Sequence, residues 1–189
     1  MNQRGSVWLV WGVFLTLCLV AFFFLYALFF GPSYDSLYQE AVLTGHVANP
    51  MRDLSMEQAQ TAFSEDFVYS LLISLRAYNL HATPHSLELP ELEVVVDEQT
   101  YTALIYQGRI SVRERKSERP DIRLITSREE VIRLLEEPSL IPESFERGDL
   151  RFEKLADGST LLFKGYFKVY PSLVRGSMSG NVIRSYFSS

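Results

Sequence analysis

Two histidines in this sequence have a spacing that is typical of metal ligands. His81 and His85 share the spacing H-x3-H, which on a helix would place two imidazoles on one face as ligands for a metal ion. Pro84 lies between them, beyond the end of the helical pattern, and proline interrupts a helix. We therefore interpret both as loop histidines, and we expect neither a metal nor a cofactor.

Paired carboxylates are the next candidates for chemistry. Glu65 with Asp66, and Glu129 with Glu130, could serve in acid–base catalysis, but each pair directly follows a serine that can cap a helix. Acids in a first helical turn are already favoured by the helix dipole. The sequence contains no H-E-x-x-H, no G-x-S-x-G and no glycine-rich phosphate loop. Because no nucleophile, base and orienting group come together, we expect a protein that is not an enzyme.

A long apolar run positions everything that follows it. Residues 7–30 contain no charged residue and no proline. At about 1.5 Å per residue, a helix of this length reaches about 36 Å, which is enough to cross a hydrocarbon core of about 30 Å. The alternative is a cleaved signal peptide, whose apolar region is only about 7 to 15 residues long and ends in small residues. We predict a single transmembrane helix, which makes the lipid bilayer the first partner.

The charges that flank this run predict its orientation. Arg4 precedes it, whereas the first Lys or Arg after it is Arg52. By the positive-inside rule, residues 1–6 form a cytoplasmic N-tail and the C-terminal part is exported. Residues 31–54 are predicted to form a juxtamembrane helix and a linker.

Composition limits what the exported part can be. With a net charge of −5, the chain lacks the excess of basic residues that binds nucleic acid, so we expect no nucleic-acid partner. Cys18, the only cysteine, lies in the predicted span, which leaves the exported part without disulfides. Its length suits one domain, which we place at residues 55–175, followed by a flexible tail at 176–189.

Serine caps predict the helices. Ser55 with Gln58 forms a capping-box pattern that opens a short helix ending near Phe63. Ser64 opens the main core helix, which is expected to continue to Asn79. Two further helical segments are predicted, one after Ser127 and one at residues 142–148.

Alternating apolar residues predict the strands. Three form an antiparallel meander, a fourth follows, and the Asp157-Gly158 pair predicts a closing hairpin. The mixed charges of residues 113–119 are typical of a solvated hairpin tip. The expected fold is α+β, with helices packed on a mostly antiparallel sheet of five or six strands. The strands are expected at residues 92–96, 100–106, 109–115, 121–126, 150–155 and 159–164, with residues 166–173 as a last strand or a short helix.

The order of these elements resembles the sterol carrier protein family. The segment VVVDEQTYTALIYQGRISVRE is similar to the family's opening strands, PDIRLITSREEVIRLLEE to its strand-to-helix segment, and IPESFERGDLRFE to its short helix, glycine and returning strand. The resemblance covers about residues 92–170, and the hairpin predicted at Asp157-Gly158 departs from the family pattern. It implies an α+β fold and, in some members, a lipid-sized apolar cavity.

Apolar residues near the Pro142–Gly148 turn and the closing element are the candidates to line such a cavity. They could equally fill an ordinary core. The candidates are Leu134, Leu140, Ile141, Phe145, Phe163, Tyr166, Phe167 and Tyr170.

Two functions from different classes follow. The main hypothesis is a non-enzymatic, membrane-anchored protein whose exported domain contacts a protein partner, self-associates or scaffolds a membrane assembly. Aromatic residues make up 13% of the chain, and exposed aromatics commonly anchor interfaces. The alternative is the binding of a lipid or another apolar ligand in the cavity. The aromatics that suggest an interface are Tyr34, Tyr38, Tyr166, Phe167, Tyr170, Tyr186 and Phe187.

Overall fold

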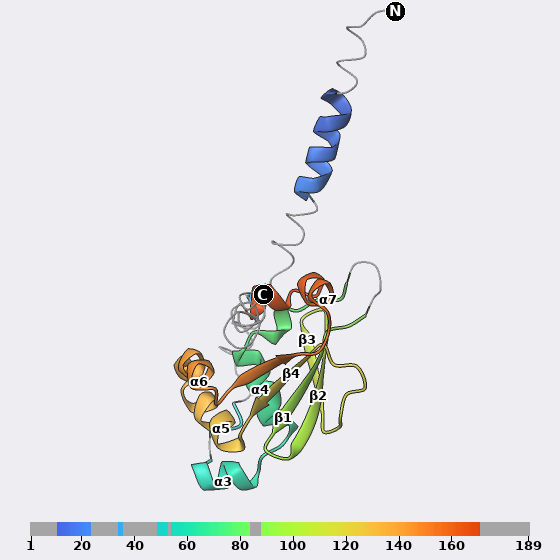
Figure 1. The fold of residues 1–189 in the computed structure, drawn as a ribbon. Helices are drawn as coiled ribbons and strands as arrows, with labels where there is room; N and C mark the ends of the chain where they lie inside the picture. Colours follow the sequence, from blue (N-terminus) through green and yellow to red (C-terminus); the bar gives the residue numbers. More distant parts are fainter. Residues whose placement is uncertain (1–10, 24–33, 36–48, 53, 84–87, 171–189) are drawn as a thin grey trace, which may run out of the picture. The chain divides into compact units, whose positions relative to one another are not determined.

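The computed structural model describes residues 11–23, 34–35, 49–52, 54–83 and 88–170 (Figure 1). The chain divides into two units, Met1–Ser33 and Tyr34–Ser189. The predicted flexible tail and most of the predicted juxtamembrane helix lie outside the described residues.

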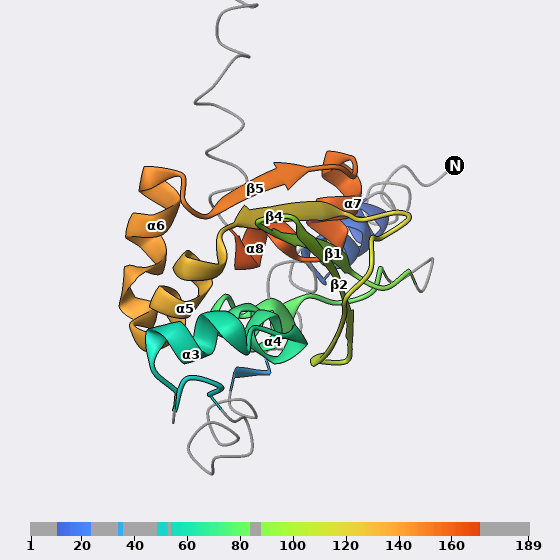
Figure 2. The same ribbon diagram turned by 90° about the horizontal axis from the view of Figure 1, so that it is seen from below.

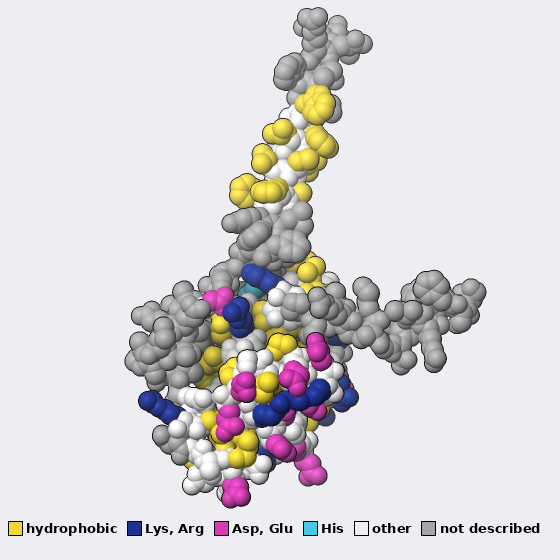
Figure 3. All heavy atoms as spheres, turned by 90° about the vertical axis from the view of Figure 1, so that its left-hand side faces the viewer, with side chains coloured by type: hydrophobic (Ala, Val, Ile, Leu, Met, Phe, Trp, Pro, Cys, Tyr) yellow, Lys and Arg dark blue, Asp and Glu magenta, His cyan; other side chains and the backbone are white. Residues whose placement is uncertain are grey.

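Within the first unit, residues 11–23 form a helix with every side chain exposed. Apolar side chains such as Trp11, Phe14 and Phe23 line it, and Figure 3 shows several of them on the visible side. No helix in the described part of the chain combines the length and the apolar character needed to cross a membrane. Residues 7–10 and 24–30 of the predicted span lie outside the described residues.

The second unit contains a five-stranded mixed sheet in the order β3-β2-β1-β4-β5. The predicted antiparallel meander of β1, β2 and β3 is confirmed, and β5 also pairs antiparallel with β4. One pairing differs, because β1 and β4 run parallel at the centre of the sheet. The strands are β1 (Glu91–Val96), β2 (Gln99–Tyr106), β3 (Arg109–Arg113), β4 (Ile122–Thr126) and β5 (Arg151–Lys154).

The helices cover one face of this sheet, as predicted for an α+β fold. Figure 2 shows α3, α4 and α5 on the same side of the strands. The serine caps predicted the helix starts correctly, including the complete capping box of Ser55 and Gln58. The helical elements are α3 (Met56–Thr61), α4 (Glu65–Ser74), η1 (Ala77–Asn79), α5 (Arg128–Glu136), η2 (Pro138–Leu140), α6 (Ile141–Arg147), α7 (Gly158–Phe163) and α8 (Tyr166–Val169).

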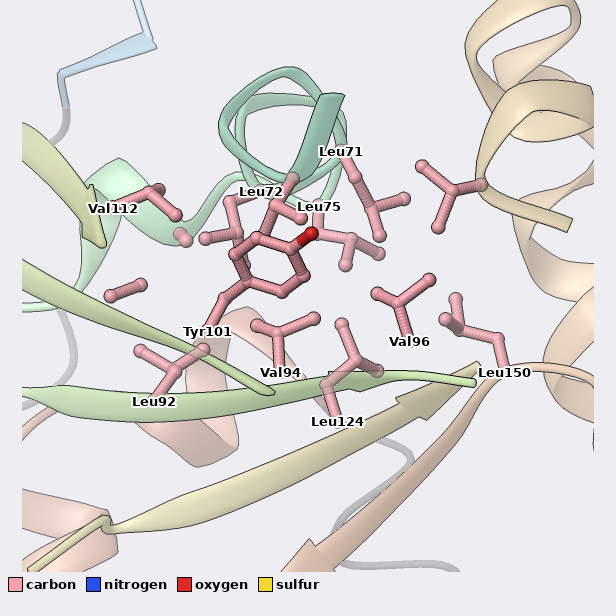
Figure 4. Packing of buried hydrophobic residues seen from close by; sticks show 14 of the residues in the cluster. Leu71, Leu72, Leu75, Leu92, Val94, Val96, Tyr101, Val112, Leu124 and Leu150 are labelled. Atoms are coloured by element: carbon pink, nitrogen blue, oxygen red, sulfur yellow. The ribbon is translucent and has the colours of Figure 1, made fainter. Parts of the chain in front are cut away.

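The core lies between α4, α5 and the covered face of the sheet. Alternation along β1 sends Leu92, Val94 and Val96 into this core, where all three are fully buried. Figure 4 shows Leu71 and Leu72 of α4 packed above these strands. The core helix is shorter than predicted, because α4 ends at Ser74 and a left-handed residue separates it from η1.

The predicted closing hairpin is wrong. The segment after Asp157 forms α7 instead of a strand, because the Asp157 carboxylate accepts hydrogen bonds from the backbone N–H groups of Ser159 and Thr160. These bonds satisfy the free donors of a first helical turn. The following segment, which was open between strand and helix, forms α8.

The charged run at residues 113–119 is not a hairpin tip. Its flanking strands β3 and β4 are separated by β2 and β1, so the chain must cross the uncovered face of the sheet between them. Two contacts hold the crossing. The Thr102 hydroxyl donates to the carbonyl of Arg115 at 2.8 Å, and the buried Ser117 hydroxyl donates to Glu91 at 2.6 Å.

Candidate apolar-ligand site

The eight predicted lining residues come from two segments that the fold places near the β5 edge of the sheet. Seven of them belong to the core or pack against it, and among the described candidates only Phe163 does neither. The buried candidates are Leu134, Tyr166 and Tyr170, whereas Leu140, Ile141, Phe145, Phe163 and Phe167 are half-buried.

Two of these candidates meet through Phe152, a residue that the sequence analysis did not single out. The Phe152 ring centroid lies 5.2 Å from that of Phe145 on α6 and 4.6 Å from that of Tyr170 after α8. Tyr166 extends the group, with its centroid 6.4 Å from that of Tyr170. Such ring pairs add to the apolar area that they bury. We call Phe145, Phe152, Tyr166 and Tyr170 the aromatic cluster.

The register of β5 explains how Phe152 reaches the cluster. Phe152 pairs with Leu124 of β4, and Leu124 in turn pairs with Val94. All three residues therefore point to the helix-covered face. β5 is an edge strand of the sheet, and Phe145 of α6 and Tyr170 after α8 cover its side of the core by packing on Phe152. The alternation in LRFEKL could have indicated Phe152 as an inward residue.

The Tyr170 hydroxyl is the exceptional atom of the cluster. It is buried and has no hydrogen-bond partner among the described residues. Burial raises the pKa of Tyr170 well above its ordinary value, so the group is a neutral donor at physiological pH. A buried hydroxyl without a partner costs about 1 to 3 kcal/mol, and an acceptor atom at this position would remove that cost.

A buried ion pair fixes α8 and, with it, half of the cluster. The Lys164 ammonium donates to both carboxylate oxygens of Asp121, at 2.8 and 3.0 Å, and to the carbonyl of Leu89 at 3.0 Å. The Tyr166 hydroxyl donates to the same carboxylate at 2.9 Å. Burial, followed by the charge of Asp121, raises the pKa of Tyr166 well above its ordinary value. The sequence analysis missed this group.

Asp121 also joins three strands. Its carboxylate accepts from the backbone N–H of Glu91 at the start of β1, and its own backbone N–H donates to the Glu91 carbonyl. Its carbonyl accepts from the backbone N–H groups of Leu155 and Ala156, which directly follow β5. One residue thus holds β1, β4, β5 and the α7–α8 segment together.

A charged groove of about 570 Å³ lies on another part of the surface, beside α5 and α6. Its two arginines are held by neighbouring acids. Arg133 donates to Glu130 at 2.6 and 2.9 Å, and Arg147 donates to Asp149 at 2.8 Å. The hydrogen bond from Arg133 is the main cause of a lowered pKa at Glu130. These contacts give the charges a structural role. The lining residues are Ser127, Glu129, Glu130, Arg133, Arg147 and Asp149.

His81 lies in a loop, and His85 lies outside the described residues. Over the part of the chain that the structure describes, no group of three or more His, Cys, Asp or Glu side chains could hold a metal ion.

The aromatics that suggested a protein interface are not all exposed. Tyr166 is fully buried and Tyr170 is 4% exposed, so the prediction that they anchor an interface is wrong. Both are buried in the core, because Lys164 and Tyr166 bind Asp121 and hold α8 against the sheet. Tyr38, Tyr186 and Phe187 lie outside the described residues.

No known protein family matches the chain, and no curated protein matches it. Among solved structures, a double mutant of a sec-alkyl sulfatase is 15% identical over 56% of this chain, with a TM-score of 0.39, and the match spans 16% of the sulfatase. A UbiJ-SCP2 ubiquinone synthesis protein is 14% identical over 64% of this chain and 91% of its own, with a TM-score of 0.32.

Sterol Carrier Protein 2 from Yarrowia lipolytica, in its apo form, is 12% identical over 60% of this chain and 82% of its own, with a TM-score of 0.29. The solved structures that match therefore include sterol carrier protein domains, the family that the sequence resembles. With TM-scores below 0.5, the likeness carries no argument about function.

Proposed function

We propose that the folded unit binds one apolar molecule with a polar end, such as a fatty acid, at the aromatic cluster, and that it does so without catalysis. The buried Tyr170 hydroxyl carries this proposal, because it has no acceptor among the described residues. A carboxylate or carbonyl oxygen of the ligand would accept its hydrogen bond.

The surroundings of this hydroxyl suit an apolar tail. Ile141 and Phe145 on α6 and Phe167 on α8 are half-buried and pack against the core. A tail placed along them would cover the apolar area that they leave exposed, at about 25 cal/mol per Å². Binding sites of this kind are mainly apolar, with a few polar groups that orient the ligand.

Native mass spectrometry of the full chain, released from phosphatidylcholine nanodiscs supplied with palmitate, tests the proposal. We expect one palmitate per chain, and we expect Tyr170→Phe to reduce its occupancy at least about tenfold, since a hydrogen bond to a charged group contributes about 1.5 to 3 kcal/mol. Tyr106→Phe, which removes an exposed hydroxyl, is the matched control. Palmitate retained equally by all three chains would contradict the proposal.

We also propose that residues 7–30 anchor the protein in a membrane, with the N-terminus cytoplasmic and the folded unit exported. A helix that is apolar on every side requires an apolar environment, and residues 11–23 are such a helix. Protease added to intact cells or spheroplasts should digest the folded unit. Digestion only after lysis would reverse this orientation.

A further inference from the structure

The exposed large apolar side chains of the folded unit gather at one end of its sheet. Among the described residues of this unit they are Tyr106, Leu155 and Leu162, which are 55%, 45% and 42% exposed. Tyr106 ends β2, Leu155 follows β5 directly, and Leu162 lies on α7 after that strand. We call these three residues the apolar end.

The strand registers show that these residues share one end. The start of β1 lies beside the last part of β2, where Glu91 pairs with Leu104. The start of β4 lies beside the end of β5, where Ile122 pairs with Lys154. Because β1 and β4 are parallel neighbours, the last residues of β2 and β5 emerge from the same end of the sheet.

The first described residue of the folded unit, Tyr34, is fixed at this same end. Its ring lies against Gly108, in the turn after β2, so closely that a Cβ atom at Gly108 would sit 2.8 Å from a ring carbon. Its backbone N–H donates to Asn79 at 2.9 Å. Asp35 holds the next position by accepting from Tyr78 and Asn79, at 2.9 and 3.0 Å. The chain therefore enters the folded unit beside the apolar end.

We propose that the apolar end rests on the surface of the lipid bilayer, with Tyr106, Leu155 and Leu162 in the interface. The inference rests on the proposed span at residues 7–30. Only residues 31–33 separate that span from Tyr34, and so short a link reaches at most about 14 Å. The opposite end lies about 26 Å farther away, the length of the eight residues of β2, and exposes the acids Asp97 and Glu98.

The charges at the apolar end indicate what kind of bilayer it fits. Lys154 and Arg109 are exposed there, but so is Asp157. Since both signs are present, the contact depends on apolar burial rather than on anionic headgroups. The Lys154 ammonium lies 5.5 Å from the centre of the Phe167 ring. A lysine can lay its apolar stem along an apolar surface while its charged end stays in water. A phosphatidylcholine surface is sufficient for this contact, and Tyr and Lys side chains suit its interface.

Depth-dependent quenching in nanodiscs tests the contact. The full chain carries Cys18→Ser and a single labelled cysteine, either Arg109→Cys beside the apolar end or Glu98→Cys at the opposite end. Both positions are exposed. A nitroxide on the phosphatidylcholine headgroup should quench the label at 109 about threefold more strongly than the label at 98, because interfacial contacts reach only about 5 to 10 Å into the bilayer. Equal quenching at both positions would overturn the proposal.

A second variant separates docking from tethering alone. The combined variant Tyr106→Ser, Leu155→Ser and Leu162→Ser should remove the excess quenching at 109, because it removes the apolar contact while the tether stays. Excess quenching that survives these three substitutions would also overturn the proposal. Palmitate occupancy of the same variant should be unchanged, since none of the three residues belongs to the aromatic cluster, so failure of this contact and failure of ligand binding are distinguishable.

Discussion

Replacing Asp121 with asparagine is expected to lower the free energy of unfolding by about 3 to 5 kcal/mol, the usual cost of removing one partner from a buried ion pair. The Lys164 side chain is only 5% exposed and would face a neutral amide in place of its ionic partner. Asparagine retains the shape of the side chain and one acceptor oxygen. The decrease in the free energy of unfolding therefore measures the effect of removing the negative charge. Urea unfolding should be followed by circular dichroism, because Trp8 and Trp11, the only tryptophans, lie outside the folded unit.

Two further variants control this result. Asp149→Asn removes a carboxylate from an exposed pair with Arg147, and such pairs contribute at most about 1 kcal/mol. Lys164→Met combined with Asp121→Asn should cost less than the sum of the single changes, since neither charge is then left alone. If Asp121→Asn cost no more than Asp149→Asn, Asp121 would not hold the strands and α8 together.

Replacing Leu124 with alanine is expected to cost about 3 to 5 kcal/mol, as deletion of a buried leucine side chain usually does. Leu124 is fully buried between Val94 and Phe152, and no flexible surface group can fill the space that it leaves. Ile125 on the same strand faces the other side of the sheet and is half-buried, so Ile125→Ala should cost about 1 kcal/mol.

This pair of variants tests the register of the central strands. A shift by one residue would exchange the two faces and reverse the order of the two costs. A larger loss from Ile125→Ala than from Leu124→Ala, measured by the same urea unfolding, would therefore contradict the sheet described above.

Local patterns in the sequence predicted most of the elements. Apolar patterns located all five strands of the sheet, β5 included. The serine at each helix start located α3, α4 and α5, because a cap is a contact between near neighbours. The segment around Pro142 was also predicted correctly, since proline is tolerated in the first turn of a helix such as α6. The resemblance to the sterol carrier family rested on this order of elements.

Such local patterns could not predict contacts between residues that are far apart in the sequence. Asp121 and Lys164 are 43 residues apart, and nothing near either of them shows that they pair. The Asp157-Gly158 pair suits both a hairpin turn and a helix cap, and the structure forms the cap. The crossing at residues 113–119 depends on the strand order, which places β2 and β1 between β3 and β4.

The position at which a photoreactive fatty acid attaches tests the proposed ligand site most directly. The full chain in phosphatidylcholine nanodiscs is irradiated with a diazirine-bearing palmitate, and the modified residues are identified by peptide mass spectrometry. We expect adducts on residues 141–152 and 166–170, which contain the aromatic cluster and its rim. Phe152→Asp should abolish these adducts, whereas Leu162→Asp, outside the cluster, should not. Adducts confined to residues 7–30, or unchanged in Phe152→Asp, would contradict a ligand site at the aromatic cluster.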